Sequence, residues 1–211
     1  MSEIHFSYST ISDLMVCSHS WINRLMKKKK PWLEAFKLGK EGHRIIQDHI
    51  GGIKADPRLE YLTEKFSIVE KTDFDPATKF NIRVKGYSVI GYLDAHDPEG
   101  KKIGEIKLSS SPWSQGKYRE SPQRKIYALA FPQYTKGILI TGQKEPEKWA
   151  TDHLKVRELD LTAKDREEAL AWLTKGIEIF EEGDFNGGLD EEGRCTDNRC
   201  PYGNNCHFRS F

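Results

Sequence analysis

The sequence predicts an α/β fold in which a mixed central β-sheet is flanked by helices. Helical periodicity occurs at both ends of the chain, alternating apolar and polar residues fill its middle, and two more strand-like segments follow a central helical stretch. The 211 residues contain no repeat or low-complexity tract, so we expect a single domain spanning residues 1–211 with a sizeable core.

Two helices are expected first. Residues 8–26 carry apolar side chains at helical spacing, with Thr10 and Asp13 in capping-box spacing near the start. Residues 33–52 form the second helix, which ends at a Gly-Gly pair and carries His43 in its middle.

Strands dominate the centre of the sequence. Residues 64–71, 80–96 and 101–111 alternate β-branched or aromatic with polar side chains, and Asp-Pro-Glu-Gly at 97–100 is typical of a turn. We therefore expect three or four antiparallel strands here.

Helices and strands then alternate. A helix is predicted over 121–132, strands over 134–141 and 153–161, and a long final helix with its capping box at Thr162 and Asp165. The final helix should direct four apolar side chains inward: Leu170, Leu173, Ile177 and Phe180.

The charge distribution is uneven although the net charge is only +1. Residues 101–148 hold ten Lys and Arg against four Asp and Glu, whereas 158–193 hold three against twelve. The basic region fits either a polyanionic partner or a solvated face. We find neither a secretory signal nor an apolar stretch of membrane-spanning length, and we expect a cytoplasmic protein without membrane association.

Four cysteines are present, three of them crowded near the C-terminus: Cys195, Cys200 and Cys206, with Cys17 in the first helix. In a reducing cytosol such clustering indicates a metal or iron–sulfur centre rather than disulfides.

Asp94, Glu105 and Lys107 are the candidate catalytic residues. Asp94 ends one predicted strand, and Glu105 and Lys107 lie two apart on the next, so their side chains share one face. Carboxylates, together with the Ile106 carbonyl and water, suit Mg²⁺ or Mn²⁺, and a lysine can position or deprotonate the attacking water. The alternative is an ordinary Glu-x-Lys pair on a surface strand.

The motifs "GYLD", "EIK" and "QRKIY", preceded by "GKEGH", resemble in order those of RecB-like nucleases within the PD-(D/E)xK superfamily. The segment "SYSTISDLMVCSHSW" is similar to the N-terminal helix of CRISPR-associated single-domain iron–sulfur exonucleases and of the AddB-type helicase–nuclease subunit.

This resemblance implies that His43, Asp94 and Glu105 bind the divalent metal and that Lys107 assists the attacking water. It also assigns Gln123 and Tyr127 to the site, in agreement with their spacing of one helical turn. They would order the phosphate backbone or the lysine.

The resemblance further implies that the four cysteines hold one [4Fe–4S] cluster, joining residues 1–30 to 190–211. The Cys-x₄-Cys spacing of Cys195 and Cys200 departs from the tighter spacing usual in the family. The alternative is a Zn²⁺ module in which His207 replaces Cys17.

The expected function is hydrolysis of DNA phosphodiester bonds at single-stranded DNA or single-stranded ends, in recombination, replication, repair, CRISPR adaptation or phage DNA processing. The basic stretch would bind the strand by phosphate contacts and stacking through Trp113, Lys117, Tyr118, Arg119, Arg124 and Lys125. The alternatives are a non-enzymatic nucleic-acid-binding protein and an accessory subunit with a nuclease fold.

Overall fold

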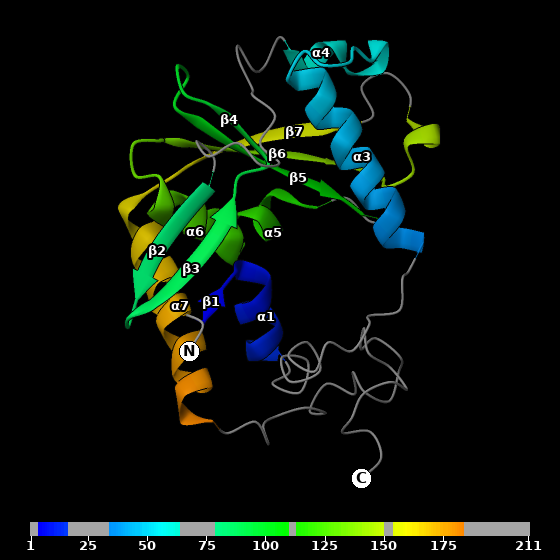
Figure 1. Ribbon diagram of the computed structural model, residues 1–211. Coiled ribbons are helices and arrows are strands. Elements are labelled where there is room, and N and C mark those ends of the chain that lie inside the picture. The colour runs from blue at the N-terminus through cyan, green and yellow to red at the C-terminus, as the bar shows by residue number, and fades with distance from the viewer. Residues whose placement is uncertain (1–3, 17–33, 64–78, 110–112, 150–153, 184–211) are drawn as a thin grey trace. The chain divides into compact units, whose positions relative to one another are not determined.

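The computed structural model describes residues 4–16, 34–63, 79–109, 113–149 and 154–183 (Figure 1). The chain forms two compact units, one of residues 1–32, 82–90 and 171–211 and the other of residues 33–81 and 91–170. Each unit has buried apolar side chains of its own.

The second unit is built on a four-stranded sheet with the strand order β4-β5-β6-β7. Strands β5 and β6 are parallel, whereas β4 pairs with β5 and β7 pairs with β6 in antiparallel fashion, so the sheet is mixed. Its elements are α3 (Glu34–Ile50), η1 (Pro57–Leu59), α4 (Glu60–Thr63), β4 (Ala95–Asp97), β5 (Lys102–Leu108), α5 (Gln115–Arg119), α6 (Pro122–Ala130), β6 (Lys136–Gly142), η2 (Pro146–Lys148), β7 (Lys155–Asp160) and the start of α7 (Ala163–Glu182).

The two faces of this sheet have different roles. Ile106 of β5 and Ile140 of β6 pair in register and pack with Ile46 of α3 in one buried core. Because side chains alternate along a strand, Glu105 and Lys107 project from the opposite face. Helices α5 and α6 contribute to that face, since a Cβ atom on Gly137 of β6 would lie 2.9 Å from the Tyr118 hydroxyl of α5 and 3.6 Å from Cγ of Arg124 of α6.

The first unit contains β1 (His5–Phe6) and α1 (Tyr8–Val16), the turn between β2 (Lys79–Val84) and β3 (Tyr87–Tyr92), and the C-terminal part of α7. The three strands form a sheet in the order β1-β3-β2, with β1 parallel to β3. Lys85 and Gly86 both have positive φ, 49° and 84°, as a two-residue hairpin turn requires. The predicted strands therefore divide between two mixed sheets rather than forming one central sheet.

The N-terminal hydrogen bonds of α7 and α1 can be compared with the two predicted capping boxes. The Asp165 amide donates to Thr162 Oγ1 at 3.2 Å and the Thr162 amide donates to Asp165 Oδ2 at 2.9 Å, so the predicted capping box is confirmed. The prediction at Thr10 is wrong, because α1 begins at Tyr8 and Thr10 instead exchanges hydrogen bonds with Ser7.

The inward face of α7 also differs from the prediction at one residue. Leu173 and Ile177 are fully buried, whereas Leu170 is 46% exposed. The buried positions follow the row Asp165, Ala169, Leu173 and Ile177 at intervals of four, and Leu170 lies one residue beside that row.

The cysteine predictions lie outside the described residues, as do the strand expected at 64–71 and the end of the first predicted helix. The [4Fe–4S] cluster at Cys17, Cys195, Cys200 and Cys206 therefore stays a prediction, as does the zinc alternative with His207. Within the described ranges, no helix has the length and apolar character needed to cross a membrane.

Candidate active site

Asp94 lies between β3 and β4, where it is held from two directions. Its Oδ2 accepts a hydrogen bond of 2.9 Å from the backbone amide of Ile106, so the carboxylate binds β5 between Glu105 and Lys107. Gln47 of α3 donates to the Asp94 carbonyl oxygen at 2.9 Å. The side chain of Asp94 is thus fixed beside the two candidate residues of β5.

Glu105 is fully buried, and its closest charged neighbour is Lys107, whose Nζ lies 2.7 Å from Oε1. Beyond this ion pair, neither Glu105 oxygen accepts a hydrogen bond from the described residues. Burial raises the pKa of Glu105; Lys107 acts in the opposite direction and the negative charge of Asp94 reinforces the rise. The sheet therefore holds a desolvated carboxylate with unsatisfied oxygens.

Polar contacts continue from Lys107 to helix α6. Lys107 Nζ donates to Gln123 Oε1 at 2.8 Å, and Gln123 Nε2 donates to the Tyr127 hydroxyl at 2.6 Å. That hydroxyl donates in turn to the Tyr92 carbonyl oxygen at 3.1 Å. Burial raises the pKa of Tyr127 well above its ordinary value, which keeps the phenol protonated as this donation requires. The structure thus connects Glu105, Lys107, Gln123 and Tyr127 in one directed chain.

The chemistry of these donors fits a hard divalent cation in part. Asp94 and the unsatisfied oxygens of Glu105 are the oxygen ligands that Mg²⁺ and Mn²⁺ prefer. However, in the described part of the chain no three His, Cys, Asp or Glu side chains are close enough together to hold a metal ion. His43, partly exposed on α3, therefore does not join Asp94 and Glu105 in this conformation. The roles of His43 and of the Ile106 carbonyl remain predictions.

Trp113 lies on the same sheet face as Lys107. Its amide donates to Oγ1 of Thr141, the β6 residue paired with Lys107, at 3.1 Å. Its carbonyl oxygen accepts from Arg157 of β7 at 3.2 Å. The indole ring lies 5.4 Å from Lys107 Nζ and 4.6 Å from Lys117 Nζ. Trp113 and Lys117 therefore stand next to the catalytic candidates.

The remaining residues of the predicted DNA-binding stretch differ in accessibility. Arg119 is exposed, whereas Tyr118 is 1% and Arg124 2% exposed. Lys125 forms ion pairs with Glu120 and Glu168 at 3.2 and 2.7 Å.

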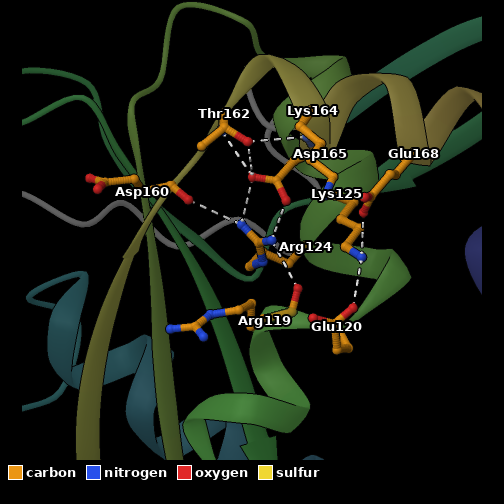
Figure 2. A network of polar contacts seen from close by, with 9 residues as sticks. All are labelled: Arg119, Glu120, Arg124, Lys125, Asp160, Thr162, Lys164, Asp165 and Glu168. Atoms are coloured by element: carbon orange, nitrogen blue, oxygen red, sulfur yellow. Dashed lines mark hydrogen bonds and ion pairs between the residues drawn. The ribbon is translucent and has the colours of Figure 1, made fainter.

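Arg124 is the centre of a buried polar network (Figure 2). Its guanidinium donates to both carboxylate oxygens of Asp165 and to the carbonyl oxygens of Asp160, at 3.2 Å, and Arg119, at 2.9 Å. These contacts join α5, α6, β7 and the start of α7. Since the guanidinium and the Tyr118 ring are covered, we leave both residues out of the DNA path.

The sequence reasoning missed three polar residues around the site. Gln47 lies one helical turn after His43, and that spacing was a usable signal. Thr141 and Arg157 carry no local motif, because only the pairing of β5, β6 and β7 brings them beside Lys107 and Trp113.

Comparison with solved structures shows that other proteins share the α/β fold of this chain. The structure of the protein named SSO0001 matches with a TM-score of 0.54 and 19% identity, over 85% of this chain and 78% of that one. A candidate exonuclease from Eubacterium rectale matches with a TM-score of 0.55 and 12% identity, over 93% and 88%. LHK-Exo, solved in complex with dAMP, matches with a TM-score of 0.50 and 13% identity, over 86% and 90%. Neither a protein-family model nor a curated protein matches the sequence.

Proposed function

We propose that this protein is a metal-dependent deoxyribonuclease of the RecB-like type that hydrolyses phosphodiester bonds at DNA ends. The observation that carries the proposal is the fully buried Glu105, which adjoins Asp94 and whose oxygens receive no hydrogen bond from the described residues beyond the Lys107 ion pair. A buried carboxylate with a raised pKa and few hydrogen bonds is a feature of ligand-binding and catalytic sites. The likeness to proteins named as exonucleases agrees in fold.

Asp94 and Glu105 would hold Mg²⁺ or Mn²⁺, which supplies Lewis-acid polarisation of the phosphate and a more acidic water. Lys107 Nζ then orients the attacking water, and Gln123 fixes the direction of the ammonium through its 2.8 Å contact. Tyr127 holds the Gln123 amide in place.

The proposed reaction is the hydrolysis of a phosphodiester bond by water. The water oxygen forms a bond to phosphorus, the bond from phosphorus to the 3′ oxygen breaks, and the departing oxygen takes up a proton. The products are a 5′-phosphate and a 3′-hydroxyl. Lys117 and Arg119, both exposed, would neutralise neighbouring phosphates.

Three wider parts of the proposal rest on the sequence alone: the cluster and the partner proteins on its family resemblance, and the single domain and the location on its length and composition. The four cysteines bind a structural [4Fe–4S] cluster, the chain is one functional domain, and the protein acts in the cytoplasm with recombination, replication or CRISPR-adaptation proteins.

Glu105→Gln tests the proposal most directly. Cleavage of end-labelled DNA should require Mg²⁺ or Mn²⁺ and should fall at least a hundredfold in this variant, the scale of losing a metal-positioned transition-state interaction (about 2.7 kcal/mol). Glu158→Gln is the matched control, because Glu158 is an exposed glutamate of β7 that pairs only with Lys136 in the described chain. A folded Glu105→Gln protein that cuts as fast as the parent would exclude this site.

A further inference from the structure

The backbone of Trp113 is anchored directly above the strands of the candidate site. Its amide and carbonyl groups bind Thr141 and Arg157, and Thr141 is fully buried on β6. Thr141 pairs with Lys107, and Arg157 pairs with Leu139, the neighbour of Glu105 in the register. The position of Trp113 is therefore set by the same three strands that position Glu105 and Lys107.

The indole ring itself is only partly buried, and two ammonium groups lie within cation–π distance of it. Lys107 Nζ is also held by Glu105 and Gln123, so that contact is fixed. Lys117 is exposed, and no carboxylate of the described residues forms an ion pair with it. Its ammonium can therefore leave the ring for a phosphate without breaking an ion pair.

Sites for single-stranded nucleic acid combine these elements: an aromatic platform for a base and cations for the adjoining phosphates. Of the five aromatic residues in the basic stretch 101–148, only Trp113 can serve, because it is partly exposed whereas the other four are buried: Tyr118, Tyr127, Phe131 and Tyr134. Both faces of an interior duplex base are already stacked, and the terminal base of a blunt end is still held in its pair, so only an unpaired base can turn freely onto Trp113.

We infer that Trp113 is a stacking site for an unpaired nucleobase next to the scissile phosphate, and that it makes the enzyme select single-stranded ends. The 5.4 Å separation of the ring from Lys107 Nζ places the stacked base in a nucleotide adjoining the reacting phosphate. This inference rests on the proposed nuclease function and adds the substrate class of the site.

Oligonucleotides with and without bases at their ends test the inference. Internally labelled single strands carry either normal bases or abasic tetrahydrofuran residues in the terminal two nucleotides at each end. Cleavage is measured in Mn²⁺, and binding is measured by fluorescence anisotropy with Ca²⁺ in place of Mn²⁺. The proteins compared are the parent, Trp113→Ala, Trp113→Phe and the control Trp172→Phe, which changes a partly buried tryptophan packed on Tyr8.

For the parent, we expect the abasic ends to lower binding and cleavage by roughly 5-fold to 150-fold, the range for losing one base–aromatic stack. With normal ends, Trp113→Ala should bind and cut as weakly as the parent does with abasic ends. Abasic ends should lower its binding and cleavage no further. Trp113→Phe should keep part of the parent's discrimination between normal and abasic ends, and Trp172→Phe should keep all of it. The preference of the parent for single strands over blunt duplexes should also disappear in Trp113→Ala.

Two results would overturn the inference. In the first, both Trp113 variants bind and cut normal and abasic ends more weakly than the parent by the same factor, which would mean that the ring only supports the fold. The other is full discrimination in Trp113→Ala. A parent that cuts no DNA in Mn²⁺, or in Mg²⁺ as a second metal, would instead refute the proposed function, and the binding comparison in Ca²⁺ would still report on stacking.

Discussion

Breaking the buried pair of Arg124 and Asp165 should destabilise the protein strongly without changing how it binds DNA. The two side chains are 3% and 11% exposed. Removing one partner of such a pair leaves the other charge buried and uncompensated, at a cost of about 3–5 kcal/mol. That is a large share of a typical total stability of roughly 5–15 kcal/mol.

The two single substitutions should differ. Arg124→Met leaves Asp165 with hydrogen bonds from the amide and hydroxyl of Thr162, so we expect about 3 kcal/mol, the lower end of the range. Asp165→Asn removes the negative charge and leaves the guanidinium with neutral acceptors, among them the carbonyl oxygens of Asp160 and Arg119, so its cost should be nearer 5 kcal/mol. The double variant should lose about 1–3 kcal/mol less than the sum, because no unpaired charge remains.

The cost should depend on pH. Burial acts to raise the pKa of Asp165, but hydrogen bonds from Arg124 and Thr162 outweigh it and hold the pKa below its ordinary value. A carboxyl with a lowered folded pKa contributes stability above its unfolded pKa of about 3.9, and that contribution is lost as the pH falls through the folded value. The difference between the parent and Arg124→Met should therefore be largest near neutral pH and shrink below about pH 4.

Urea unfolding followed by tryptophan fluorescence measures these free energies, with Lys164→Met as the control for an exposed ion pair, where no change is expected. DNA affinity at several salt concentrations, measured where Arg124→Met is folded, completes the test. Single costs below about 1 kcal/mol that simply add would refute the pairing argument. A flatter salt dependence in Arg124→Met would restore Arg124 as a phosphate contact.

Two further predictions concern the exposed cations and the cysteines. Replacing Lys117 and Arg119 together with alanine should weaken binding to all DNA sequences and reduce the slope of log affinity against log salt by about 0.7 per lost phosphate contact on a single strand; an unchanged slope would remove them from the DNA path. Cys17→Ser should remove iron, brown colour and thermal stability together from anaerobically purified protein, whereas a colourless parent that keeps one zinc ion after the substitution would contradict the iron–sulfur prediction.

Local patterns predicted the elements better than their assembly. The Gly-Gly end of α3, the capping box at Thr162 and the spacing of Glu105 and Lys107 depend on neighbours within one turn or one strand, and the structure agrees with each. The division of the strands between two sheets depends on pairing between distant segments, which the alternation of residues does not encode. The same limit hid Thr141 and Arg157.

Charge was the least reliable signal for the site. The run of basic residues in 101–148 predicts one DNA-binding surface. In the structure, however, helices α5 and α6 direct successive side chains to different sides. Lys117 and Arg119 lie outside, whereas Arg124 points inward to Asp165. A cation's role therefore depends on which acceptors the fold places beside it, and in Arg124 those acceptors come from residues 119, 160 and 165.

The two buried ion pairs of the second unit show how a structural pair differs from a functional one. Asp165 accepts hydrogen bonds from Arg124 and Thr162, and within the described ranges Nε is the one guanidinium nitrogen of Arg124 without a partner. Glu105 is buried more completely, yet apart from the Lys107 ion pair no described residue gives either of its oxygens a hydrogen bond. Burying a carboxylate without such bonds costs free energy that an apolar residue at the same strand position would not cost. That unfavourable arrangement stands beside Asp94, Lys107 and Trp113, where the divalent cation of the proposed function would supply the missing interactions.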